Sequence, residues 1–257
     1  MITVTSAQLY AWIAAFLWPL ARILGLVSVA PLFGNIGIPA RVKLGLGILL
    51  ALVIAPGLPA VPAPDPMSLD GLLVLAREAM IGLAMGFAMR IVLAAVELAG
   101  EVMGMTMGLG FATFYDPQTR ANTSAIGQLL ALLTLLIFIA TNLHLVLLAA
   151  LADSFTSMPI APTPPGTGMF RQLATWAGAI FSSGLQLALP VVAALLVINL
   201  ALGILTRAAP QLNLFGIGFP ITIGAGFLML ALVLPYLAVP VQNLLQQGLE
   251  TVGRMVR

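Results

Sequence analysis

Charged residues are missing from very long stretches of this sequence. None occurs between Arg171 and Arg207, and none occurs between Arg207 and Glu250. Charged residues make up 7% of the chain and apolar residues 61%, whereas a soluble globular domain carries about 25% charged residues. So few charges cannot cover the surface of a protein in water. The chain is therefore predicted to be an integral, membrane-type protein.

Six apolar segments divide the sequence, and each is comparable with or longer than the roughly 20 residues that cross a bilayer. No hydrophilic stretch between them is long enough to form a separate soluble domain. We therefore expect an all-α, polytopic protein in which residues 1–257 form one continuous bundle, with an uncleaved first helix. Prolines 190 and 235 should kink the later helices. The segments cover approximately residues 9–33, 44–58, 70–108, 124–152, 170–205 and 215–247.

The third segment is too long for a simple membrane span. It contains no proline between Asp70 and Gly108, and Ser68 or Asp70 can cap its start. A continuous helix of this length would measure about 57 Å, whereas the hydrocarbon core of a bilayer is only about 30 Å thick. The helix is therefore expected to project from the membrane, to bend, or to pack inside an assembly.

One face of this third helix combines small residues with charges. Glycines spaced by about four residues let another helix backbone approach closely in an apolar medium, and charges within a membrane usually face protein or water. Two interpretations stay open: a face that docks on a neighbouring helix or subunit, or a crossing within the chain that has a polar edge. The face carries Gly82, Gly86, Gly100, Gly104 and Gly108, with Arg90, Glu97 and Glu101 along its border.

The stretch that follows is predicted to be a soft apolar loop. It begins with methionines at alternate positions, which are flexible and adapt to different neighbours, and it ends in an Asp-Pro pair that favours a turn. The alternative is an ordinary connection whose phenylalanines pack into the core. The residues concerned are Met103, Met105 and Met107, followed by Gly110, Phe111, Phe114, Tyr115, Asp116 and Pro117.

The residues that usually carry chemistry are sparse. Cysteine is absent, which excludes disulfides and thiolate metal sites. His144 is the only histidine and is expected to be a buried, hydrogen-bonded side chain, while Asp116 and Asp153 lie in connections rather than facing each other as a catalytic pair. The net charge of +2 comes from scattered basic residues, which argues against nucleic acid as a partner. We expect no enzyme activity, no catalytic residue, no cofactor and no metal site.

The orientation of the helices in a membrane stays undetermined. The positive-inside rule compares the basic residues of short loops on the two sides, and here the numbers are equal. Arg41, Lys43, Arg120 and Arg207 oppose Arg77, Arg171, Arg254 and Arg257.

Three stretches together resemble one known family. The first contains Arg22, the run 31–34 and the run 38–43 with Arg41; the second is the run 110–117; the third, and the most specific, is the run 199–220. They are similar to the FliR family of flagellar export proteins, whose counterpart in virulence secretion is SctT, and the similarity extends over essentially the whole chain. The third stretch includes Asn199, Gly203, Arg207, Pro210, Gln211, Asn213, Gly218, Phe219 and Pro220.

This resemblance implies a function that composition does not show. A member of the family joins FliP-like and FliQ-like subunits in the type III export gate of the flagellar basal body, in the bacterial inner membrane. It implies FlhB-like and FlhA-like partners and unfolded protein substrates, and an assembly largely above the bilayer plane would explain the long third helix.

The resemblance also implies a division of the chain and a closing element. Residues 1–165 would be FliP-like, and residues 166–257 would form a FliQ-like helical hairpin. The family's plug loop, which closes the channel, corresponds to residues 110–120. The alternative function is a small-molecule or ion transporter, although the sequence shows no internal repeat of the kind common in that class.

Overall fold

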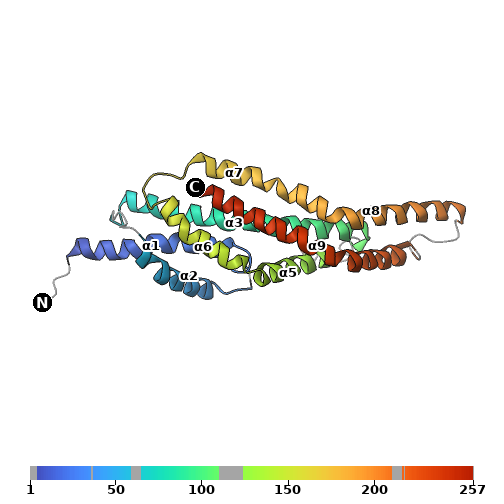
Figure 1. Cartoon of the computed structure of the whole chain (residues 1–257), viewed down its shortest axis with the longest axis horizontal. Coiled ribbons are helices and arrows are strands. Elements are labelled where there is room, and N and C mark those ends of the chain that lie inside the picture. The colour runs from blue at the N-terminus through green and yellow to red at the C-terminus, as the bar shows by residue number, and fades with distance from the viewer. Residues whose placement is uncertain are drawn as a thin grey trace. The chain divides into compact units, whose positions relative to one another are not determined.

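The computed structural model describes residues 5–35, 37–58, 65–109, 124–209, 216 and 218–256. All the regular elements in these ranges are helices (Figure 1), which confirms the all-α prediction. Five helical spans are long and apolar enough to cross a membrane: Trp12–Val29, Ala40–Gly57, Leu69–Thr106, Thr167–Ala208 and Phe219–Met255. The bent pair Ala125–Ala140 and Leu143–Ser157 meets the same test only when taken together, as one interrupted span. The described part of the chain is therefore that of a polytopic membrane-type protein.

The helices follow the predicted segments closely. They are α1 (Ser6–Val29), α2 (Ala40–Ile54), the short 3-10 helix η1 (Ala55–Gly57), α3 (Leu69–Thr106), α5 (Ala125–Ala140), α6 (Leu143–Ser157), α7 (Thr167–Ala177), α8 (Ala179–Ala208) and α9 (Phe219–Met255).

Side-chain caps fix the starts of three helices. The Thr5 side chain accepts a hydrogen bond from the backbone N–H of Gln8, and the Gln8 side chain bonds back to Thr5, so α1 begins with a capping box. Ser68 Oγ accepts from the backbone N–H of Gly71 at 3.1 Å at the start of α3. Ser124 caps α5 in the same way. Each cap satisfies a backbone donor that the helix cannot satisfy itself.

Several helix boundaries differ from the sequence-based expectation, among them the end of the last helix, which runs to Met255, and three of the differences change the predicted elements or faces. The fourth segment is two helices, because Asn142 lies between α5 and α6 with a φ of 57°, a left-handed conformation that asparagine tolerates better than most residues. The fifth segment starts earlier, at Thr167, and α7 is separated from α8 at Gly178. The third helix ends at Thr106, and Gly108 follows it with a φ of 86°, so Gly108 does not belong to the helical face predicted for it.

The chain divides into two compact units, and the first comprises residues 1–91, 142–177 and 246–257. Its described elements are α1, α2, η1, the first part of α3, α6, α7 and the end of α9. Helices α1 and α2 lie side by side (Figure 1). The interior is formed by fully buried side chains of α1 and α3, among them Trp18, Ile23, Leu26, Met85 and Met89.

The second unit comprises residues 92–141 and 178–245. It contains the second part of α3, α5, α8 and most of α9. Its helices approach closely where glycine replaces a larger side chain: a Cβ added to Gly184 of α8 would lie 2.8 Å from the Ala95 carbonyl oxygen of α3. Val96, Ala99, Met103, Val191 and Leu195 are buried within this unit.

Many large apolar side chains remain exposed in both units. In α2 only Gly47 and Ala51 are buried, and Val53 is 79% exposed. Val197 of α8 and Tyr236 of α9 are 68% and 78% exposed. Apolar surface of this extent marks contact with lipid or with other proteins.

Candidate functional site

A cluster of charged side chains is buried inside the first unit. Arg22 of α1 and Glu78 of α3 are both 0% exposed, and Arg77 beside Glu78 is 7% exposed. The Arg22 Nε and Nη2 atoms each lie 2.6 Å from Glu78 Oε2, and Arg77 Nη1 lies 2.7 Å from Glu78 Oε1. One carboxylate therefore bridges two guanidinium groups.

The other donors of Arg22 reach the C-terminal end of α6. Its Nη1 donates to the carbonyl oxygen of Ser154 at 2.7 Å and to Ser154 Oγ at 2.9 Å, and its Nη2 donates to the Met158 carbonyl oxygen at 2.9 Å. The guanidinium carbon also lies 4.2 Å from the centre of the Phe155 ring. Carbonyls at a helix C-terminus lack partners within the helix and favour a positive charge, so Arg22 links α1, α3 and α6.

The cluster carries an excess of positive charge. Two guanidinium groups face one carboxylate, and the second cation is balanced only by a dipole, because Arg77 Nη1 donates to the Pro159 carbonyl oxygen at 2.9 Å. Arg77 Nε has no hydrogen-bond partner among the described residues. A buried ionic group of this kind is held only by its partners, and loss of one partner is costly. The cluster therefore fastens α1, α3 and the end of α6 to one another.

The sequence contained only part of the signal for this cluster. Arg22 lies in the middle of the apolar segment 9–33. The orientation count above places Arg77 among the basic residues that flank the segments, and Glu78 has no part in the sequence-based predictions. A cation in the middle of an apolar helix pairs with an opposite charge or with backbone carbonyls, which makes each of the eight acidic residues of the chain a candidate. That preference alone does not single out Glu78.

Glycines of α3 in the first unit contact the backbone of α1. A Cβ added to Gly82 would overlap the Arg22 carbonyl oxygen, and one added to Gly86 would lie 2.8 Å from that of Leu26. Gly25 of α1 faces α3 in the same way, since its Cβ would lie 2.6 Å from the Ala79 carbonyl oxygen. At Gly82 and Gly86 the close packing is therefore between two helices of the same chain. This agrees with the interpretation of the face as a crossing within the chain rather than as a docking face for another subunit.

In the second unit the same face meets the start of α5. A Cβ added to Gly100 would overlap the backbone of Gly127, and one added to Gly104 would lie 3.4 Å from the Ser124 side chain. Glu101 accepts a hydrogen bond from the Ser124 backbone N–H at 3.1 Å. The other predicted border residues differ in exposure: Arg90 is exposed and Glu97 is half-buried.

The end of α3 is fixed against the start of α9. The Thr222 hydroxyl donates to the Met107 carbonyl oxygen at 3.3 Å, and a Cβ added to Gly108 would lie 2.8 Å from the Phe219 ring. Met107 is fully buried, whereas Met105 is 57% exposed. A cavity of about 350 Å³ lies here, lined in part by Asn199, Gly203, Gly218 and Phe219. The structure therefore joins the end of the third segment to the stretch that carried the most specific resemblance.

Several predicted site residues lie outside the described residues. These are Gly110, Phe111, Phe114, Tyr115, Asp116 and Pro117 of the predicted plug, and Pro210, Gln211 and Asn213 of the family stretch. The others are placed: Arg41 is exposed in the first turn of α2, Arg207 is exposed in the last turn of α8, and Pro220 lies in the first turn of α9.

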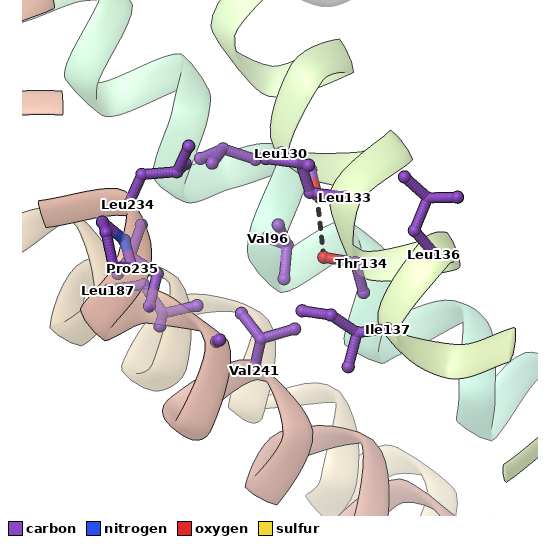
Figure 2. Close-up of a pocket in the computed structure, with 12 residues that line it drawn as sticks. Val96, Leu130, Leu133, Thr134, Leu136, Ile137, Leu187, Leu234, Pro235 and Val241 are labelled. Atoms are coloured by element: carbon purple, nitrogen blue, oxygen red, sulfur yellow. Dashed lines mark hydrogen bonds between the residues drawn. The ribbon is translucent and has the colours of Figure 1, made fainter. Parts of the chain in front are cut away.

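A second cavity in this unit is almost wholly apolar. It has a volume of about 330 Å³ and is lined by side chains of α3, α5, α8 and α9, including Val96, Leu187 and Val241. Figure 2 shows Thr134 among these apolar side chains, with its hydroxyl donating to the Leu130 carbonyl oxygen at 2.8 Å. The Thr134 hydroxyl therefore uses its hydrogen within its own helix, and the cavity presents an apolar surface to anything that enters it. Nowhere in the described ranges do three His, Asp or Glu side chains gather as metal ligands would.

Long apolar helices, buried charges that fasten them and wide exposed apolar surfaces define a polytopic membrane-type protein. Residues 13–248 match the family described as "Bacterial export proteins, family 1". The chain is 42% identical to the flagellar biosynthetic protein FliR of Pectobacterium carotovorum subsp. carotovorum, over 91% of this chain and 90% of that protein. The corresponding protein of Escherichia coli K12 is 41% identical over 93% and 91% of the two chains, and that of Bacillus subtilis 168 is 32% identical over 94% of each.

The chain therefore belongs to the FliR family of bacterial export proteins. The resemblance that the sequence motifs carried is confirmed over nearly the whole length.

Proposed function

We propose that this chain is a structural, non-enzymatic subunit of the flagellar type III protein export gate. In this proposal it completes a channel together with FliP-like and FliQ-like subunits, contacts FlhB-like and FlhA-like export components, and lies in the inner membrane at the flagellar basal body. The observation that carries the proposal is the family match over residues 13–248. The exposed apolar surfaces of α2, α8 and α9 support it, because a gate subunit must be covered by neighbours.

The proposed gating element is the stretch 110–117, with Phe111, Phe114 and Tyr115 as its bulky members. A closed gate must exclude water and ions, and apolar side chains that fill a constriction can do so by keeping it dry. The chain enters this stretch through Gly108, whose positive φ and close approach to Phe219 suit glycine. The contacts of Met107 and Gly108 with α9 would hold the base of the loop while its tip moves aside for a substrate.

A division of the chain into two parts completes the proposal. Residues 1–165 would play the part of a FliP-like subunit and residues 166–257 that of a FliQ-like helical hairpin. In this arrangement one polypeptide fills the places of two different neighbours, which would close a ring of helices.

Deletion of residues 111–115 tests the plug assignment. The deletion variant is expected to assemble with its partners but to leak ions, because the apolar barrier is removed while the anchored ends of the loop remain. Ion permeability of cells or vesicles that contain the assembled complex is the measurement. A matched control replaces Phe111, Phe114 and Tyr115 by leucine, which keeps a large apolar side chain at each position and should keep the gate tight. Normal impermeability of the assembled deletion variant would refute the assignment.

A further inference from the structure

A cavity of about 470 Å³ in the first unit is lined by two arginines. Its walls come from α7 and from the last turns of α9, and the lining residues are Gly168, Arg171, Gln172, Thr175, Trp176, Thr251 and Arg254. Arg171 and Arg254 are both exposed at its mouth. No acidic residue is among those that line it, so the cavity carries two positive charges.

The guanidinium groups of these arginines are available to a ligand. In the described part of the chain neither forms an ion pair with a carboxylate. Arg254 Nη2 donates a long hydrogen bond of 3.4 Å to Thr251 Oγ1. The hydroxyls of Thr175 and Thr251 instead donate to carbonyl oxygens of their own helices. The hydrogen-bond donors that the cavity offers to a ligand are therefore the two guanidinium groups. The threonine hydroxyl hydrogens are already used within their own helices.

The two arginines of the cavity lie near the ends of apolar stretches, where a membrane interface is expected. Arg171 lies near the start of the apolar stretch 167–208, and Arg254 lies near the end of the apolar stretch 219–255. Between each of them and Arg207 the only charged residue is Glu250, one turn from Arg254. Arginine and tryptophan concentrate where apolar helices end at lipid headgroups, and Trp176 is held in place by a hydrogen bond of 2.9 Å from its Nε1 to the Ala88 carbonyl oxygen.

We propose that this cavity, the arginine cavity, binds the phosphate of an anionic phospholipid headgroup. Arg171 and Arg254 would each donate charge-assisted hydrogen bonds to the phosphate oxygens, a geometry for which the guanidinium group is suited. The Trp176 ring would lie at the level of the glycerol backbone. The proposed lipid site does not depend on the proposed export function. Lipid headgroups can contact the ends of apolar helices both when the helices cross a bilayer and when they lie above it.

A titration of the full-length chain in detergent tests the proposal, in whatever assembly it forms. Short-chain phosphatidylglycerol, short-chain phosphatidylcholine and inorganic phosphate are the three probes. Arg171→Gln and Arg254→Gln should each weaken phosphatidylglycerol binding about fivefold, and the double variant about thirtyfold, since each arginine near an anionic headgroup contributes roughly that factor. Lys43→Gln, which removes one charge from α2 outside the cavity, should leave binding unchanged.

A second variant fills the cavity without removing charge. A Cβ on Gly168 would meet nothing within 4 Å, so Gly168→Leu should fold normally and block the headgroup sterically. Gly45→Leu on α2, whose Cβ also meets nothing within 4 Å, is the matched control.

Preference of the wild-type chain for phosphatidylglycerol, lost in both kinds of variant, supports the proposal. Equal binding of the two lipids would overturn it, because the net charge of the headgroup would then make no difference to binding. Equally tight binding of inorganic phosphate would overturn the lipid assignment, and so would full binding by the double variant.

Discussion

Replacement of Glu78 by glutamine should destabilise the protein severely. The carboxylate lies 2.6 Å and 2.7 Å from the two guanidinium groups that it bridges, and neither Glu78 nor Arg22 is exposed. Glutamine keeps the volume of glutamate but leaves two buried cations without a counter-charge. Removal of one partner from a buried ion pair costs about 3–5 kcal/mol, and the free energy of unfolding should fall by that amount.

The cluster offers a matched control, because its charges are unequal. Arg77→Met also removes one charge, but it leaves Arg22 and Glu78 as a balanced pair and withdraws the excess cation. Arg77→Met loses two hydrogen bonds, from Nη1 to Glu78 Oε1 at 2.7 Å and to the Pro159 carbonyl oxygen at 2.9 Å, each worth about 1.5–3 kcal/mol. It also removes the desolvation penalty of one buried cation, which is of similar or larger size and offsets that loss. The free energy of unfolding should therefore fall less in Arg77→Met than in Glu78→Gln.

Equilibrium unfolding of the full-length chain in detergent by denaturant measures both variants under identical conditions. Substitution of Glu250, which is exposed, by glutamine gives a reference for a surface change, expected within about 0.5 kcal/mol of the wild type. The reasoning is refuted when Glu78→Gln and Arg77→Met prove equally stable, because the bridging carboxylate then does not balance the cluster.

Three further substitutions test the helix contacts and one helix cap. Gly82→Ala should destabilise the protein by about 1–3 kcal/mol, because the added Cβ overlaps the Arg22 carbonyl oxygen. Gly45→Ala has open space around its Cβ and should stabilise the protein by up to about 1 kcal/mol through helix propensity. A thermal melt that ranks the two variants the other way would contradict the close contact between α1 and α3. Ser124→Ala removes the cap that accepts from the Gly127 N–H at 3.1 Å and should lower the unfolding free energy by about 1 kcal/mol, and no change in the same melt would show that the cap contributes nothing.

The sequence by itself determined the class of the protein and the course of its helices. Hydropathy is a local property, so the apolar runs located α1, α2, α3, α8 and α9 without any knowledge of their neighbours. Local breaks were harder to foresee. The interruption at Asn142 depends on one residue in a left-handed conformation, and an apolar run that continues on both sides conceals it.

Only the tertiary structure decided which distant residues meet. Arg22 and Glu78 are 56 positions apart in the sequence, and nothing in the spacing of either helix specifies that pairing, since it depends on how α1 crosses α3. The same holds for the arginine cavity, where α7 and the end of α9 bring Arg171 and Arg254 together. Periodicity along one helix gives the composition of a face, but the partner of that face is set by the packing of the other helices.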